Sequence, residues 1–211
     1  MHKEAYLKSK KEVAKWMRRL YKKGLTTSLG GNISLRFDDN HIAITASETD
    51  KGRIKASEIA IVSMDGDLLD STNRVSMETG MHLAIYKERP DVQAIVHAHA
   101  PMGSLYATTN QTINTTLLAE AYTIIGYPKK AAYAAPGSDK LAGNVAKASS
   151  NANVILMENH GVLAVGKSLL QAFDRIEVLE NAAKMTALTT LLKDQKALNE
   201  QQLTELKSLF A

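Results

Sequence analysis

Apolar and polar residues alternate in several short segments of the chain, and this spacing predicts β-strands. Ile33, Leu35 and Phe37 alternate with polar residues, as in a strand with one buried face. Two longer segments carry a turn signal between apolar runs, at Asp65-Gly66 in one and near Asn159 to Gly161 in the other. The segments predicted to form strands are 32–37, 41–47, 59–70, 92–100 and 153–166.

Apolar residues spaced three and four apart predict helices between and after these strands. Pro101 suits the first turn of one helix, and Ser138 suits the N-cap of another. The predicted helices are 3–23, 76–89, 101–110, 137–151 and 168–194. The last is expected to be a long C-terminal helix whose leucines offer apolar surface to a neighbour, namely Leu191, Leu192, Leu198, Leu203 and Leu206. Segment 111–135 has short apolar runs broken by glycine and proline, and predicts no firm element.

This alternation of helices with short, hairpin-linked strands predicts a mixed α/β fold with a largely antiparallel sheet between helices. The chain has 211 residues, which is enough for one domain with a sizeable core. We therefore expect a single domain over residues 1–211. No GxGxxG or Walker glycine motif follows a strand, so no local motif supports nucleotide binding.

Composition narrows the chemistry and the partners. Cysteine is absent, which excludes disulfides and thiolate nucleophiles and leaves histidine and carboxylate as metal ligands. The formal charge of +4 is concentrated in residues 3–23, with nine Lys or Arg against two Glu, which favours the solvated face of a packed helix over a nucleic-acid site. No apolar run approaches the roughly 20 residues that span a bilayer, and no signal-peptide pattern opens the chain. The expectation is a cytoplasmic protein without membrane or nucleic-acid partners.

Histidines interrupt two apolar segments and suggest a metal site. In a strand, His97 and His99 point to the same side because successive side chains alternate. His160 lies at the predicted turn of another strand pair. Burying neighbouring imidazoles without a partner is costly, whereas a divalent metal commonly takes three such ligands and keeps one position open.

A carboxylate and two polar loops could complete this site. Glu78 opens the helix before the histidine strand, where it is either a metal ligand or an ordinary N-terminal glutamate favoured by the helix dipole. His82, one turn later, is a rival ligand. The glycine-rich loop before Ile33 and the loop beginning at Ser47 have the backbone and side-chain donors of an anion pocket, although each alone is more often a turn.

Together these motifs resemble the class II aldolase and adducin-head family. The resemblance rests on GNIS, TASxxDKG, S-x-E, HxH followed by proline, GSxxL and NHG, in this order over about residues 10 to 190. Within the family the pattern is most similar to L-fuculose-1-phosphate aldolase. The resemblance implies an α/β/α domain assembled as a homotetramer with active sites at subunit interfaces.

The resemblance also implies a zinc ion, with manganese or cobalt as alternatives. Its implied ligands are His97, His99, His160 and Glu78, and Glu78 is also the implied catalytic acid/base. The implied phosphate-binding residues are Gly31, Asn32, Ser47 and Ser76. The implied enzyme is a zinc-dependent aldehyde-lyase of carbohydrate metabolism. It would reversibly cleave a ketose 1-phosphate to dihydroxyacetone phosphate and an aldehyde through a metal-stabilised enediolate.

Three positions depart from the fuculose-phosphate aldolase pattern. Met77 replaces a phosphate-binding serine, Glu48 replaces a glycine, and Leu118 stands near the position of a proton-donating tyrosine. Candidate replacements for that tyrosine are Glu120, Tyr122 and Tyr133. The alternatives are therefore a 4-epimerase, dehydratase or decarboxylase of the same family. A non-catalytic domain like the adducin head is disfavoured, because all of the implied metal ligands are present.

Overall fold

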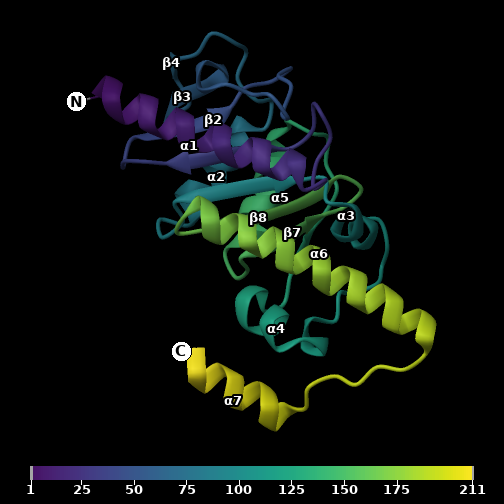
Figure 1. Ribbon diagram of the computed structural model, residues 1–211. Helices are drawn as coiled ribbons and strands as arrows, with labels where there is room; N and C mark the ends of the chain where they lie inside the picture. Colours follow the sequence, from purple (N-terminus) through teal and green to yellow (C-terminus); the bar gives the residue numbers. More distant parts are fainter. Residues whose placement is uncertain (1, 211) are drawn as a thin grey trace.

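A computed structural model describes residues 2–210 and contains one eight-stranded sheet, in the order β4-β3-β2-β1-β5-β8-β7-β6 (Figure 1). The strands are β1 Asn32–Arg36, β2 His41–Thr45, β3 Ile59–Ser63, β4 Leu68–Asp70, β5 Ala94–Ala98, β6 Lys129–Ala131, β7 Val154–Met157 and β8 Gly161–Gly166. All neighbours are antiparallel except β6 and β7. The predicted antiparallel sheet is confirmed. Met1 and Ala211, the ends of the expected domain, lie outside the described residues.

Helices cover both faces of the sheet, which confirms the α/β/α architecture. The helices are α1 His2–Lys22, α2 Thr79–Glu88, α3 Pro101–Ala107, α4 Ala119–Ile125, α5 Asp139–Ser149, α6 Leu169–Leu192 and α7 Glu200–Phe210, and short 3-10 turns span Ala56–Glu58 and Thr115–Leu117. In Figure 1, α1 and α6 lie on the near side of the sheet, with α2 and α5 behind it. None of the helices described is long and apolar enough to cross a membrane.

Strand alternation divides the core between these two helical layers. On β5, Ala94, Val96 and Ala98 pack with α1 and α6, whereas Ile95 faces the layer of α2 and α5. His97 shares the parity of Ile95 and is fully buried. The central position of β5, between β1 and β8, therefore places a histidine in the middle of the molecule.

The predicted helix boundaries hold in most cases. Pro101 is the first residue of α3, and the Ser138 hydroxyl accepts a hydrogen bond from Leu141 N at the start of α5. In segment 111–135 the structure shows α4 and β6. The helix predicted over 168–194 ends at Leu192, where Lys193 adopts a left-handed conformation, so one prediction is wrong: Leu198, Leu203 and Leu206 are not part of this helix.

The leucines beyond that end therefore do not extend the apolar surface of α6. Leu198 lies in the connection, and Leu203 and Leu206 belong to α7. This separate helix packs against α4, with Lys207 Nζ 5.8 Å from the centre of the Tyr122 ring.

Candidate metal centre

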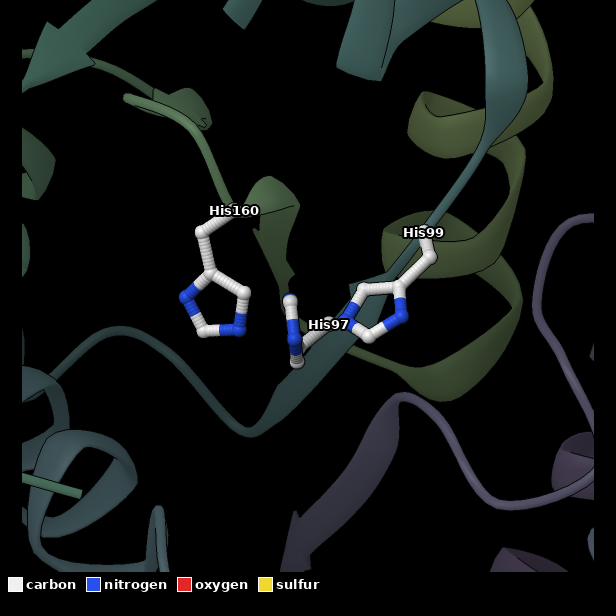
Figure 2. Close-up of side chains that lie close together, drawn as sticks. All are labelled: His97, His99 and His160. Atoms are coloured by element: carbon white, nitrogen blue, oxygen red, sulfur yellow. The ribbon is translucent and has the colours of Figure 1, made fainter. Parts of the chain in front are cut away.

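Three histidines from two parts of the chain meet at one end of the central strands. His97 is on β5, His99 follows the end of that strand, and His160 is in the turn between β7 and β8. The pairing of Ala98 with Val162 brings the two segments together. Figure 2 shows the three rings gathered in one place, with His97 between the other two.

The rings are close enough to share one ion. One ligand nitrogen of each histidine lies within 4.8 Å of those of the other two. The ring centres are 5.0 Å apart for His97 and His99, 4.9 Å for His97 and His160, and 5.6 Å for the third pair. His97 Nδ1 lies 2.9 Å from the carbonyl oxygen of Val162, to which it donates its proton. The lone pair of His97 is therefore on Nε2, toward Glu78.

Glu78 faces this group from the N-cap position of α2. Its Oε2 atom is 3.4 Å from His97 Nε2, and its Oε1 atom is 3.4 Å from His160 Nε2. Asn32 on β1 donates a hydrogen bond from Nδ2 to Glu78 Oε2 at 2.7 Å. Asn32 pairs directly with His97 across the sheet, so β1, β5 and α2 fix the carboxylate together.

The donor atoms fit a divalent metal. Glu78 Oε1, His97 Nε2 and His99 Nε2 are buried and make no hydrogen bond to any residue described. Leaving such an atom unpaired costs about 1–3 kcal/mol. Three imidazole nitrogens and one carboxylate oxygen are a donor set that zinc and similar ions accept.

The protonation states also suit a metal. Burial lowers the pKa of His99 to about 4 and also lowers the pKa of His160, so both rings are neutral at pH 7, as ligands must be. Burial alone would raise the pKa of Glu78. The adjacent His97 and His160 and the Asn32 amide outweigh that effect, and the pKa of Glu78 is lowered from its ordinary value.

Of the four residues expected to bind phosphate, Gly31, Ser47 and Ser76 lie on loops and Asn32 begins β1, and these segments meet beside Glu78. Ser76 Oγ accepts a hydrogen bond from Glu78 N at 3.3 Å, and Ser47 Oγ donates to Val75 O at 2.9 Å. A bridge between Ala46 and Val75 joins these two loops.

Gly31, at the end of the loop before β1, and Asn32, the first residue of β1, complete that group. Gly31 has a φ of +67°, and a Cβ there would lie 2.8 Å from the carbonyl oxygen of His97. Asn32 already uses its side-chain oxygen and one N–H group on His82 and Glu78, which leaves one N–H group.

The departures from the aldolase pattern have distinct structural settings. Glu48 is exposed and has a φ of +56°, a conformation that glycine adopts without strain, which accounts for the glycine in the pattern. Met77 is exposed.

Tyr122 is buried against α7, whereas Tyr133 is exposed and its backbone N donates to Glu158, two residues before His160. Of the tyrosines considered, Tyr133 therefore is tied to the histidine turn.

Sequence reasoning missed the buried polar contacts of His82. Its Nδ1 atom is 2.7 Å from Ser34 Oγ, and its Nε2 atom is 2.6 Å from Asn32 Oδ1. Because both ring nitrogens are engaged, His82 has no lone pair to offer as a rival metal ligand. The available signal was the spacing of Glu78, His82 and Tyr86, four residues apart on one helix face.

Comparisons with known proteins agree with this architecture. The chain is 36% identical over 188 residues to an L-fuculose phosphate aldolase of Methanocaldococcus jannaschii, covering 87% of this chain and 98% of the relative. It is 33% identical over 174 residues to a 3-oxo-tetronate 4-phosphate decarboxylase of Haemophilus influenzae, covering 80% and 81%. A solved L-fuculose 1-phosphate aldolase superposes with a TM-score of 0.89 at 30% identity, covering 96% of each chain.

The family model of the class II aldolase and adducin N-terminal domain matches residues 11–187. That match includes β5, the turn between β7 and β8 that holds His160, and the start of α2 at Glu78. The enzymes named above are lyases of phosphorylated sugars or sugar acids. The chain belongs to the class II aldolase and adducin N-terminal domain family.

Proposed function

We propose that the protein is a divalent-metal-dependent aldolase that reversibly cleaves a ketose 1-phosphate to dihydroxyacetone phosphate and an aldehyde. The observation that carries this proposal is the convergence of unpaired ligand atoms from Glu78, His97 and His99 beside His160. Relatives that cleave fuculose phosphate support the choice of substrate class.

The proposed metal ligands are His97, His99, His160 and, in the resting site, Glu78. Zinc is the expected ion, and manganese or cobalt are alternatives because imidazole suits all three. When bound, such an ion would act as a Lewis acid that polarises the oxygens of the substrate.

Glu78 is the proposed acid/base. Its carboxylate lies among the histidines and is also held by Asn32, so it can release the metal position to substrate and remain in place. As the carbon–carbon bond breaks, the C4 hydroxyl group of the substrate loses its proton, and the Glu78 carboxylate would take up that proton and deliver it to C3 of the enediolate, which gives dihydroxyacetone phosphate. In the reverse direction, the same carboxylate removes that proton.

The substrate phosphate is proposed to lie against Gly31, Asn32, Ser47 and Ser76. Support comes from the meeting of their segments beside Glu78 and from the positive φ of Gly31, which leaves backbone N–H groups accessible in a turn. We propose a cytoplasmic homotetramer with sites at subunit interfaces, a single domain over residues 1–211, and a role in carbohydrate metabolism, as the family resemblance implies. Light scattering of the purified protein tests the tetramer.

A decarboxylase of a sugar-acid phosphate is the second candidate. A relative named as a decarboxylase of this kind is 33% identical. Leu118 also favours the decarboxylase, because leucine cannot donate the proton that the aldolase pattern assigns to a tyrosine. The two reactions share a substrate phosphate and a developing negative charge on carbon. They differ in the product released, which is an aldehyde in one and carbon dioxide in the other.

The deciding experiment measures both products from one preparation. Metal-free protein is reloaded with zinc, manganese or cobalt, and dihydroxyacetone phosphate is assayed with L-fuculose 1-phosphate and related ketose 1-phosphates. Carbon dioxide is assayed with 3-oxo-tetronate 4-phosphate. Release of dihydroxyacetone phosphate that a chelator abolishes and metal restores supports the aldolase, whereas carbon dioxide alone supports the decarboxylase.

Two variants connect that activity to the site. His97→Ala should lose both metal and activity. His41→Ala, which changes a histidine on β2 that pairs with Asp38, should keep both. A fully active His97→Ala protein would refute the proposed centre.

A further inference from the structure

A line of buried polar side chains runs from Glu78 into the interior between α2 and β1. His82 and Tyr86 come from the helix and Glu78 is its N-cap residue, whereas Asn32 and Ser34 come from the strand. All five are buried, His82 and Ser34 fully. Each contacts the next: the steps are 2.7 Å from Glu78 to Asn32, 2.6 Å to His82, 2.7 Å to Ser34 and 2.8 Å to Tyr86.

The regular spacing of helix and strand makes this line possible. Four residues of α-helix rise about 6 Å, and two residues of a strand advance about 6.6 Å. The helix side chains at 78, 82 and 86 therefore remain in step with the strand side chains at 32 and 34. Polar side chains from α2 and from β1 therefore alternate along the line where the helix packs on the strand.

The hydrogen bonds in this line have one direction, fixed at the Glu78 end. A carboxylate only accepts, so Asn32 must turn its NH₂ group to Glu78 and its Oδ1 atom to His82. His82 Nε2 must then carry the proton, and Nδ1 must accept from the Ser34 hydroxyl. Ser34 Oγ in turn accepts from the Tyr86 hydroxyl.

We propose that His82 is a positioning residue, which through Asn32 holds the Glu78 carboxylate in the orientation that leaves Oε1 free beside His160. Without an N–H donor at His82, the buried Oδ1 atom of Asn32 has no hydrogen-bond partner, and the amide is held at its Glu78 end alone. An amide that turns to give Oδ1 another partner would weaken the hydrogen bond from Nδ2, which is the one side-chain hydrogen bond of Glu78 within the described structure.

This inference rests on the proposed function only for its catalytic consequence. In that function, Glu78 would give up its place as a ligand when substrate binds, and the hydrogen bond from Asn32 would then hold its carboxylate. The orientation of the carboxylate would govern proton transfer, and thus kcat, more than substrate binding, and thus KM. The hydrogen-bond direction itself can be tested without any substrate.

The first test determines which ring nitrogen of His82 carries the proton. Metal-free protein labelled with ¹⁵N in histidine is studied by long-range ¹H–¹⁵N correlation, and the His82 signals are identified by their loss in His82→Gln. The expected result is a single tautomer with the proton on Nε2. A proton on Nδ1, or exchange between both tautomers, would overturn the proposal, whether or not the protein is an aldolase.

The second test compares three variants after cobalt loading. His82→Leu removes the donor to Asn32, whereas His82→Gln replaces it with an amide N–H group. Tyr86→Phe removes only the far hydroxyl and leaves the bonds from Ser34 to Glu78 intact, so it is the matched control for lost buried polarity. We expect His82→Leu to change the visible cobalt spectrum, and Tyr86→Phe to retain the spectrum of the original protein.

Activity then separates positioning from simple stabilisation. In His82→Leu, kcat should fall about 10–100-fold, with KM within about threefold. In Tyr86→Phe, and in His82→Gln by rescue, kcat should remain within about threefold. A spectrum and kcat of His82→Leu equal to those of Tyr86→Phe would show a merely structural role. If the unmodified protein cleaves no ketose phosphate, the proposed function fails, while the tautomer and the cobalt spectra still decide this inference.

Discussion

Gly161 lies directly against the carbonyl oxygen of Ala98, and a Cβ on Gly161 would lie 2.6 Å from that oxygen. The same added atom would be 3.0 Å from His99 Cδ2 and 3.2 Å from His97 Cε1. The backbone cannot move aside as a flexible side chain can. The absence of a side chain at Gly161 therefore lets β8 lie close to His97 on β5 and to His99 just after it.

Gly161→Ala should therefore destabilise the fold and disturb the metal centre. We expect the free energy of unfolding to fall by about 1–3 kcal/mol, as for other overpacked sites, with weaker zinc binding. Urea unfolding and zinc titration measure the two effects. Gly143→Ala is the control: it is exposed within α5, a Cβ there meets nothing within 4 Å, and it should stabilise by about 0.5–1 kcal/mol. Equal effects of the two substitutions would contradict this account of Gly161.

Zinc should raise the thermal stability of the protein through His160. A ligand that binds only the folded state at 100 times its Kd stabilises by about 2.7 kcal/mol. Differential scanning calorimetry with and without zinc should show this rise for the unmodified protein and for His41→Ala. For His160→Ala the rise should largely disappear. A full rise in His160→Ala would place the ion elsewhere.

The carboxylate of Glu180 on α6 caps the start of α3, just after the histidine strand. It accepts hydrogen bonds from Met102 N and Gly103 N, both at 2.8 Å. Glu180→Ala should reduce the free energy of unfolding by about 1 kcal/mol, the usual effect of losing an N-terminal cap. Glu177→Ala, which removes only partly exposed ion pairs with Arg19 and Lys23, should cost less, about 0–1 kcal/mol. Chemical unfolding of both variants measures the two losses. A loss for Glu177→Ala as large as that for Glu180→Ala would contradict the capping role of Glu180.

Lys51 should make stability rise with pH on the alkaline side. Its buried ammonium donates to Ala46 O at 2.8 Å and to Thr49 Oγ1 at 2.9 Å, and burial lowers the pKa of Lys51 from 10.5 to about 8. Between pH 8 and 10.5 the unfolded chain therefore binds more protons at this residue than the folded chain. The free energy of unfolding contributed by Lys51 must then increase with pH in that window.

Comparison with Lys51→Met isolates this contribution. Relative to the variant, the unmodified protein should gain about 1–2 kcal/mol between pH 7.5 and 9.5, from a limiting slope of about 1.4 kcal/mol per pH unit. Urea unfolding at both pH values provides the measurement. Parallel stability changes in the two proteins would show that Lys51 keeps its ordinary pKa.

Local patterns were sufficient to predict the sheet, the helix starts and the three histidines that come together. Alternation identified the strands, because one face of each is buried. Ser138 and Pro101 marked helix starts, because their chemistry acts within one turn. The end of α6 was predicted within two residues, but Leu198, Leu203 and Leu206 were wrongly assigned to that helix, because the apolar pattern continues past Lys193, the residue that turns left-handed.

Contacts between distant segments could not be predicted in this way. Asn32 lies opposite His97 only because β1 and β5 are neighbours, although 57 residues separate the ends of these two five-residue strands along the chain. The role of His82 depends on that same neighbour relationship, because its two partners are both on β1. The regular spacing of apolar residues identifies the buried face of a helix or strand. It does not identify the element that this face contacts.

The central place of β5 in the sheet has a consequence for the order of folding. His97 contacts Val162, 65 positions further along the chain, so in an unfolded chain only His97 and His99 are near enough to chelate together. Closing that long loop costs conformational entropy, and metal binding can offset this cost only after His160 has reached His97 and His99. An ion bound by all of the proposed ligands would therefore bind late in folding, after the sheet has formed. The affinity of a folding intermediate for the ion would show whether β8 has already paired with β5.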